Sequence, residues 1–257
     1  MHKLLEGKKG LVLGVANANS IAWAVAQKAA EAGAELAITC QNERFERKVR
    51  TLVEDSHMEA HLYRCDATEP EDLRRLFQSL DSDFCSLDFA LHAWAFAPPA
   101  ALKGDFVDTT WDDFATAHRV STHSLVEISR GLRDRMNYDG SILALTYLGA
   151  ERVAPGYNVM GVAKAALEAS VRYLASDLGS SGIRVNAISP GPISTLSARG
   201  VPGFTEMLKK HREIAPLGRN VEADEVGNAA VFLFSDLSTA ITGQVLYVDA
   251  GYSIMGV

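Results

Sequence analysis

The stretch Leu11–Ala26, which reads LVLGVANANSIAWAVA, predicts the fold of this chain. It runs from an apolar strand through a loop of small residues into a helix that starts near Ser20. Backbone N–H groups and the positive end of the helix dipole then face the loop, and such a turn can bind a pyrophosphate. Only Gly14 remains of the G-x-G-x-x-G fingerprint, so a plain strand–helix turn with a serine cap is an equal alternative.

The composition is that of an ordinary globular protein, with 257 residues, 47% hydrophobic and 22% charged. This length suits one large α/β domain or two small ones. The net charge is −7 and no run of Lys or Arg reaches five residues. The chain is therefore expected to bind neither a nucleic acid nor, through a basic patch, a membrane surface.

The cysteine, histidine and N-terminal patterns predict a cytoplasmic protein without a metal. The three cysteines are scattered and form no CxxC pair, which favours reduced thiols over a disulfide with a spare thiol. The seven histidines show no metal-binding spacing, and the first residues lack the apolar core of a signal peptide. An uncharged run over residues 10–27 is long enough to span a membrane, but polar residues interrupt it, so no membrane association is expected.

Short apolar runs alternate with amphipathic stretches along the whole chain. The apolar runs predict strands near residues 10–15, 35–40, 61–65, 88–94, 141–146, 184–189 and 244–249. The amphipathic stretches predict helices near residues 20–32, 43–55, 69–79, 110–136 and 222–234. This alternation implies right-handed crossovers and a parallel sheet covered on both faces. We therefore predict an α/β protein over residues 1–257: a single-domain, Rossmann-type doubly wound fold with a seven-stranded parallel sheet.

Polar residues at the ends of the second and third predicted strands are placed to read a dinucleotide. Gln41 and Asn42 can bond the hydroxyls of the adenosine ribose but bring no cation for the extra phosphate of NADP. Arg44 lies nearby, although a solvated helix face is its more ordinary role. Asp66 can either meet an adenine amino group or cap the following helix.

A second stretch, LTYLGAERVAPGYNVMGVAKAALEAS, brings Tyr147, Tyr157 and Lys164 close together in the sequence. Pro155 is suited to open a helix, and Gly179 is suited to end it. On that helix Tyr157 and Lys164 are two turns apart and share a face. Taken alone, the pair is more simply explained by a packed phenol and a solvated ammonium group.

In order along the chain, these pieces resemble the NADH-dependent enoyl-[acyl-carrier-protein] reductase family of bacterial type II fatty acid synthesis, a divergent branch of the short-chain dehydrogenase/reductases. The resemblance covers essentially the whole chain and includes QNE, CDAT, LHAWAFAP, YLGAER, YNVMG, GIRVNAISPGPIST and ITGQVLYVDAGYSIMG. Its most specific element is the array of tyrosine, nine residues, tyrosine, six residues and lysine. Ordinary relatives use a serine thirteen residues before the second tyrosine; Ala144 stands there, and Tyr147 supplies the hydroxyl instead.

The resemblance implies reduction of trans-2-enoyl-acyl-carrier-protein thioesters, with NADH as the cofactor and NAD+ as its product. Hydride delivered to the β-carbon makes an enolate, and a hydrogen-bond donor at the thioester oxygen lowers the barrier. The family pattern assigns Tyr157 as this donor. It assigns Lys164 to the nicotinamide ribose hydroxyls, where its charge would favour an ionised or strongly polarised Tyr157. Tyr147 is the third catalytic residue, and it either shapes the pocket or also assists proton delivery.

Further contacts follow from the resemblance. The acyl substrate should be bordered by Ala97, Tyr147 and Tyr157, and a mobile loop at about residues 194–216 should close over it. The dinucleotide should contact Gly14, Ser20, Ile21, Gln41, Asp66, Ala67, Trp94, Lys164, Ile193, Ser194, Thr195, Leu196 and Ser197. Trp94 either stacks beside the adenine side of the cofactor or fills core space. Three loop residues either face the acyl chain or pack a short surface helix; they are Met207, Leu208 and Ile214.

The resemblance also implies two partners: the acyl carrier protein that carries the enoyl substrate, and further copies of this chain in a homotetramer. In the tetramer the C-terminal region GQVLYVDAGYSIMG would lie at a subunit contact. Two other functions are weighed against this one. A reductase of ketones is disfavoured by Ala144, and a catalytically silent dinucleotide sensor has no reason to combine Tyr147, Tyr157 and Lys164.

Overall fold

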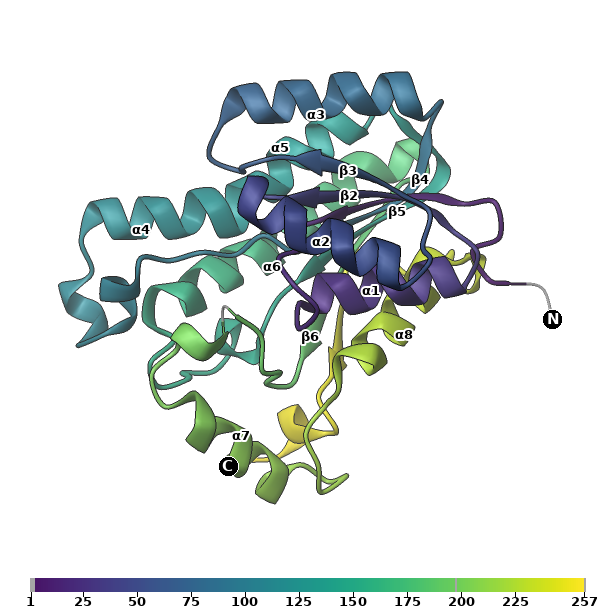
Figure 1. Ribbon diagram of the computed structural model, residues 1–257. Helices are drawn as coiled ribbons and strands as arrows, with labels where there is room; N and C mark the ends of the chain where they lie inside the picture. Colours follow the sequence, from purple (N-terminus) through teal and green to yellow (C-terminus); the bar gives the residue numbers. More distant parts are fainter. Residues whose placement is uncertain (1–2, 197, 257) are drawn as a thin grey trace.

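The computed structural model describes residues 3–196 and 198–256, and seven parallel strands form one sheet within them (Figure 1). The strand order is β3-β2-β1-β4-β5-β6-β7. The strands are β1 (Lys9–Leu13), β2 (Glu35–Cys40), β3 (Ala60–Arg64), β4 (Leu87–His92), β5 (Met136–Leu145), β6 (Arg184–Pro190) and β7 (Val245–Val248). The predicted seven-stranded parallel sheet is therefore confirmed. The order reverses between β1 and β4, and open α/β sheets bind ligands at such a switch point.

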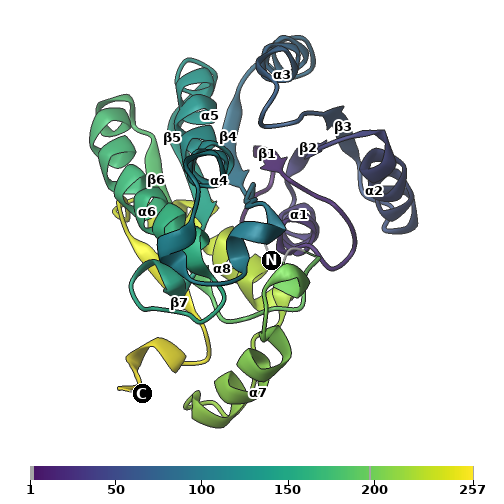
Figure 2. The same ribbon diagram turned by 90° about the vertical axis from the view of Figure 1, so that its left-hand side faces the viewer.

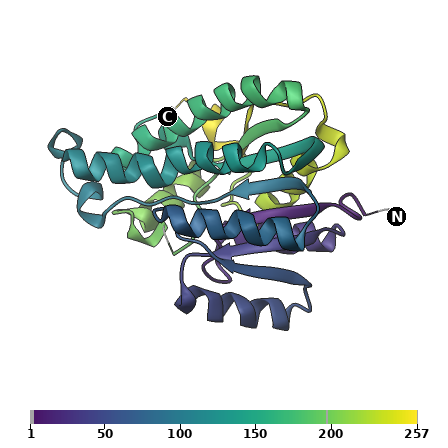
Figure 3. The same cartoon turned by 90° about the horizontal axis from the view of Figure 1, so that it is seen from above.

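Helices cover both faces of the sheet (Figure 2). One face carries α1 (Ile21–Glu31), α2 (Glu43–Asp55) and α8 (Ala223–Phe234), whose apolar residues share one buried cluster. The other face carries α3 (Pro70–Asp83), α4 (Trp111–His118), α5 (Ser124–Leu132) and α6 (Asn158–Leu178). Seen from above, the helices of this second face lie side by side (Figure 3). Among the described residues, no helix is long and apolar enough to cross a membrane.

The connection from β6 to β7 departs from the predicted right-handed crossovers. It steps across the sheet in the same direction as the connections from β4 to β5 and from β5 to β6. Its helix α8, however, lies on the opposite face from α5 and α6 and packs along α1. This crossover therefore has the opposite hand. The segment of residues 191–222 is long enough to pass around the carboxyl end of the sheet first, and it contains α7 (Phe204–Ile214).

Two predicted helix boundaries are wrong. The helix expected over residues 110–136 is interrupted by a π-helical turn at Arg119–His123 and ends at Leu132, because the chain must enter β5 at Met136. The helix expected to open at Pro155 begins instead at Asn158. Gly156 has a φ of 77°, and this left-handed backbone cannot belong to a right-handed helix that opens at Pro155.

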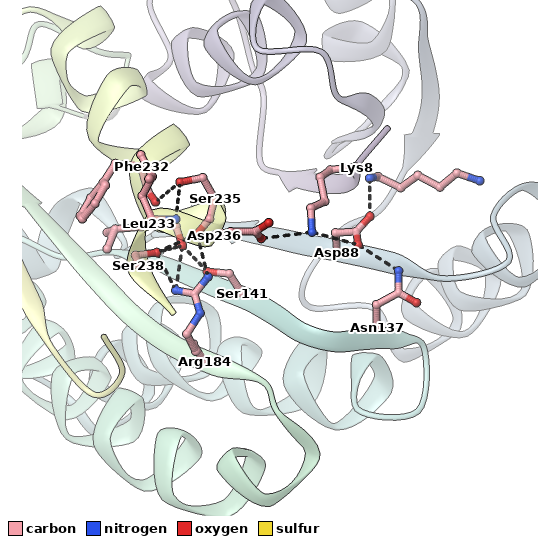
Figure 4. Close-up of polar contacts among 12 residues, drawn as sticks. Lys8, Asp88, Asn137, Ser141, Arg184, Phe232, Leu233, Ser235, Asp236 and Ser238 are labelled. Carbon is pink, nitrogen blue, oxygen red and sulfur yellow. Dashed lines mark hydrogen bonds and ion pairs between the residues drawn. The ribbon is translucent and has the colours of Figure 1, made fainter. Parts of the chain in front are cut away.

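At the amino end of β6, a buried arginine joins the sheet to the end of α8 (Figure 4). Arg184 is only 6% exposed, and its Nη1 donates to the Leu233 carbonyl oxygen and to Ser238 Oγ, each at 2.9 Å. Ser141 Oγ donates to the same Leu233 carbonyl at 2.8 Å. These bonds satisfy a carbonyl in the last turn of α8 that has no partner within the helix. They fix α8, and with it the face that supports α1.

Candidate active site

A cavity of about 410 Å³ opens at the carboxyl ends of the central strands. The turn after β1, the segments after β4, β5 and β6, helix α6 and the loop with α7 all contribute to its wall. Its lining includes Gly14, Ser20, Ile21, Ala95, Ala97, Thr146, Tyr147, Tyr157, Met160, Lys164, Ile193, Thr195, Leu196, Phe204 and Met207. Small and apolar side chains predominate, so the cavity suits a ligand with a long apolar part.

The two tyrosines meet in this cavity. Tyr147 follows β5 and Tyr157 directly precedes α6, and their rings pack edge to face with centroids 5.0 Å apart. Gly149 allows this approach, because a Cβ at that position would lie 2.6 Å from Cδ1 of Tyr157. The Tyr147 hydroxyl donates to Met207 Sδ at 3.1 Å, which links the pair to α7.

Lys164 lies on α6, seven residues after Tyr157, and lines the same cavity; it is 4% exposed. Its Nζ donates to the carbonyl oxygen of Leu145 at 2.6 Å. Burial lowers the pKa of Lys164 to about 8, although the Glu168 carboxylate raises it. Burial also raises the pKa of Tyr157 well above its usual range, and the nearby Tyr147 adds to this. In this structure burial therefore favours the protonated phenol, which can donate a hydrogen bond.

The turn after β1 is built to accept an anion. Gly14 has a φ of 90°, and a Cβ there would lie 2.9 Å from Cδ1 of Trp94 and 3.1 Å from the Ala93 carbonyl oxygen. Ser20 stands at the N-cap of α1 but makes no cap bond; its Oγ accepts from the N–H groups of Ala16 and Asn17 at 3.2 and 3.1 Å. It therefore shapes the loop. The first turn of α1 has no acidic residue, so its positive end stays available to a phosphate.

The residues expected to read the adenosine half lie beyond the cavity wall, at the ends of β2 and β3. Gln41 Nε2 donates to Asp66 Oδ2 at 2.8 Å, and Thr68 donates to Asp66 Oδ1 through its N–H and its Oγ1. Asp66 does not cap α3, whose N-cap is Glu69. Asn42 accepts from the Phe45 N–H and caps α2, so its side chain is already occupied.

The remaining predicted contacts divide into two groups. Ile193, Thr195 and Leu196 line the cavity, whereas Ser194 does not and Ser197 lies outside the described residues. Ala67 and Trp94 are buried in the core. The Trp94 ring is 8% exposed and packs edge to face against His92, so it supports the Gly14 turn from inside the core.

The sequence left two roles open for the loop before β7: its apolar residues either face the acyl chain or pack a short helix. The structure contains a helix that also contributes to the cavity wall. Residues 204–214 form the helix α7, and one side of it faces the cavity through Phe204 and Met207. Leu208 and Ile214 are partly buried but do not line the cavity.

Three polar residues near Lys164 were not singled out from the sequence. Thr146 Oγ1 donates to Glu168 Oε1 at 2.6 Å, and both side chains are buried. His92 is 1% exposed, with its Nε2 2.7 Å from Ser124 Oγ, and burial lowers its pKa to about 3. The spacing of four between Lys164 and Glu168 was a usable signal, since such residues adjoin on a helix. A lone histidine in an apolar strand offered none.

This fold, with a tyrosine and a lysine facing a cavity at the switch point, defines a dinucleotide-dependent oxidoreductase of the short-chain dehydrogenase/reductase type. The family model described as "Enoyl-(Acyl carrier protein) reductase" matches residues 14–253. The chain belongs to the enoyl-[acyl-carrier-protein] reductase family.

Known relatives agree in sequence and in structure. The NADH-dependent enoyl-[acyl-carrier-protein] reductase FabI of Rickettsia typhi is 50% identical over 254 residues, covering 99% of this chain and 97% of the relative. The crystal structure of the Bacillus cereus reductase with NADP+ and an indole naphthyridinone has a TM-score of 0.97 at 49% identity, covering 99% and 100% of the two chains. The Anaplasma phagocytophilum reductase in complex with NAD has a TM-score of 0.95 at 44% identity, covering 100% and 98%.

Proposed function

We propose that this chain reduces the carbon–carbon double bond of trans-2-enoyl-acyl-carrier-protein thioesters with NADH, the last reductive step of the fatty acid elongation cycle. The main support for this function is that Tyr147, Tyr157 and Lys164 border one cavity lined mainly by small and apolar residues. The relatives named above bear this activity in their names.

Tyr157 is the hydrogen-bond donor to the thioester oxygen. Bound NADH supplies the hydride that adds to the β-carbon of the substrate. Negative charge then develops on the oxygen, and a protonated phenol already fixed beside it stabilises that charge without reorganisation. The raised pKa of Tyr157, caused by burial, supports a donor that keeps its proton until the enolate forms.

Lys164 orients the dinucleotide at the nicotinamide ribose. Its ammonium group is held by the Leu145 carbonyl and retains N–H groups that can donate to ribose hydroxyls. The pyrophosphate would lie at the start of α1, where Gly14 permits close approach and Ser20 holds the loop. Gln41 and Asp66 would read the adenosine, and Ile193 to Leu196 would border the nicotinamide half.

The acyl chain lies between the segment after β4 and helix α7. Ala97, Met160 and Phe204 supply apolar walls there. Tyr147 shapes this space: its ring packs on Tyr157 while its hydroxyl bonds Met207. The loop at about residues 194–216 closes over the substrate, and Gly200 and Gly203 within it are compatible with hinge movement.

The alternative substrate is a ketone, and one residue favours the enoyl thioester. Ala144, fully buried near the end of β5, carries no hydroxyl group. The serine hydroxyl that ketone-reducing relatives use at this position therefore has no counterpart there. Comparing NADH oxidation with crotonyl and acetoacetyl thioesters tests this directly. A preference for acetoacetyl thioester, or NADH oxidation that depends on neither substrate, would overturn the proposed function.

We further propose a cytoplasmic homotetramer that receives its substrate from acyl carrier protein. β7 is the edge strand of the sheet, and Leu246 on this strand is 38% exposed. Ile254 beyond it is 79% exposed. Covering an apolar sheet edge with a second copy is a common solution to the problem of unpaired strand edges. Light scattering coupled to size exclusion measures the assembly.

A further inference from the structure

Leu145, the last residue of β5, and Thr146, which follows it, are each joined to α6 by a short polar contact. The Leu145 carbonyl oxygen accepts from Lys164 Nζ at 2.6 Å, and Thr146 Oγ1 donates to Glu168 Oε1, also at 2.6 Å. Lys164 and Glu168 are one helical turn apart on α6, and the next residue after Thr146 is Tyr147. The contacts therefore lie directly behind the catalytic tyrosine and lysine.

We propose that Glu168 is a positioning residue of this reductase, which keeps Lys164 charged inside the cavity and, through Thr146, fixes the end of β5 that carries Tyr147. The proposal rests on the proposed function, because Lys164 matters here as the group that binds the ribose. Glu168 does not line the cavity, so it acts through its two neighbours.

Burial makes this assistance necessary. Thr146, Lys164 and Glu168 are 4%, 4% and 6% exposed, and a buried ammonium tends to lose its proton unless a negative charge lies near. A buried carboxylate is itself costly, and apolar residues of similar size usually give equal or better stability. A glutamate at this position is therefore better explained by its effect on Lys164 than by stability.

The charged and titratable groups around Lys164 and Glu168 act in opposing directions. Lys164 is faced by Glu168 from its own helix and by His92 from β4, and burial leaves His92 neutral at neutral pH because its pKa falls to about 3. The pKa of Glu168 is raised by burial and by Glu151, and lowered by the Thr146 hydrogen bond, Arg172 and Lys164. The Glu168 carboxylate also contributes to raising the pKa of Tyr247. The Thr146 bond thus favours the ionised carboxylate and opposes the larger effect of burial.

The test uses two variants and a matched control. Glu168→Gln removes the charge but keeps an oxygen for Thr146, whereas Thr146→Val removes the bond but keeps the carboxylate. Glu151→Gln removes an exposed carboxylate from the same surroundings. For each protein the NADH dissociation constant is measured by fluorescence from pH 6 to pH 9, and kcat/KM with crotonyl thioester is measured over the same range.

Loss of the Glu168 charge lowers the pKa of Lys164, so the ammonium disappears at a lower pH than in the parent. We expect Glu168→Gln to weaken NADH binding about fivefold at pH 8 and less than about twofold at pH 6, as a one-unit shift of a group titrating near 8 requires. Both NADH affinity and kcat/KM should fall on the alkaline side of the pH profile, which we call the alkaline limb. Thr146→Val should also shift this limb toward lower pH, but by less than Glu168→Gln does. Glu151→Gln should not move it toward acid.

A loss of affinity that is equal at every pH, or a limb that stays with the parent, would overturn the proposal. If Glu168→Gln does not fold, Thr146→Val decides alone, and an unshifted limb in that variant contradicts the inference. Failure of the proposed function has a different signature: the parent would then show no enoyl-dependent NADH oxidation at any pH, while the binding titration would still report on Glu168.

Discussion

The ring of Tyr147 stands nearly perpendicular to the ring of Tyr157, with an interplanar angle of 71° and centroids 5.0 Å apart. An edge-to-face pair is a favourable aromatic geometry, and it fixes each ring more firmly than an apolar wall would. The phenol of Tyr157 is therefore held in place before substrate arrives. A preset donor of this kind stabilises charge as it develops, which is the role we propose for Tyr157.

Tyr157→Phe should lower kcat on the order of 100-fold or more while changing KM for the enoyl substrate only slightly. The lost hydrogen bond is strongest in the transition state, whereas the ring and its packing on Tyr147 remain. Steady-state kinetics with crotonyl thioester measures both constants. Tyr173→Phe, on the exposed side of α6, is the matched control and should behave like the parent. Near-parent kcat in Tyr157→Phe would remove the proposed donor.

Gly149→Ala should disturb the tyrosine pair. The added methyl group would lie 2.6 Å from Tyr157 and 3.1 Å from Tyr147, so at least one ring must move. Overpacking of this kind typically costs about 1–3 kcal/mol, and we expect kcat to fall at least about tenfold as well. Gly179→Ala is the control, because nothing lies within 4 Å of a Cβ built there. Denaturant unfolding and kinetics on both variants check the prediction; an undisturbed Gly149→Ala enzyme would contradict it.

NADH should be preferred over NADPH by at least about tenfold in kcat/KM, since like charges placed together cost several kcal/mol. The 2′-phosphate of NADPH would approach the Gln41–Asp66 pair, where a carboxylate is present and Gln41 brings no positive charge. Gln41→Arg should raise kcat/KM for NADPH, because a guanidinium can bind phosphate through two donors. Arg44→Ala should leave the preference unchanged. A loss of NADPH activity in that variant would identify Arg44 as a phosphate ligand.

The burial of Lys164 predicts a pH dependence of stability. Its pKa falls from 10.5 to about 8 on folding, so the folded state binds this proton less tightly than the unfolded state. The resulting destabilisation is complete below pH 8 and disappears as the pH rises towards 10.5. Relative to Lys164→Met, the parent should gain about 2–3 kcal/mol in free energy of unfolding between pH 7 and pH 10.5.

Urea unfolding of the two proteins across this range measures the difference. Lys48→Met, at an exposed position on α2, serves as the reference for removal of a lysine. If the free energy of unfolding changed with pH in the same way in Lys164→Met and in the parent, Lys164 would titrate normally.

Much of the fold could be predicted because each strand and helix carries its own pattern. The runs at residues 35–40 and 43–55 coincide with β2 and α2, since apolar continuity and amphipathic spacing are local properties. The break in the helix over residues 110–136 could not be predicted in the same way. Its π-helical turn depends on contacts with distant segments, such as the bond from Thr122 Oγ1 to the Ala163 carbonyl.

The candidate site shows the same division. The array of Tyr147, Tyr157 and Lys164 was visible because it lies within one short stretch. The roles of Asn42 and Trp94 depend on how their side chains turn in three dimensions: Asn42 caps its own helix and Trp94 points into the core. Glu168 was passed over because a glutamate on a helix is normally solvated, and only the position of β5 buries it.

Tyr147→Phe separates the two roles that the sequence left open for Tyr147. The hydroxyl donates to Met207 Sδ at 3.1 Å, and burial raises its pKa to about 12, so proton release at neutral pH is disfavoured. We therefore expect Tyr147→Phe to keep kcat within a few-fold of the parent, because the ring still packs on Tyr157. KM for the enoyl thioester should rise by about two- to tenfold, as the loss of one hydrogen bond to α7 implies.

Met207→Leu provides the matched variant, since it removes the sulfur acceptor and keeps an apolar side chain of similar volume on α7. It should reproduce the rise in KM, and the double variant should add little to either single change, because both remove the same contact. A fall of kcat by about 100-fold in Tyr147→Phe alone, with Met207→Leu unaffected, would instead assign Tyr147 to proton delivery.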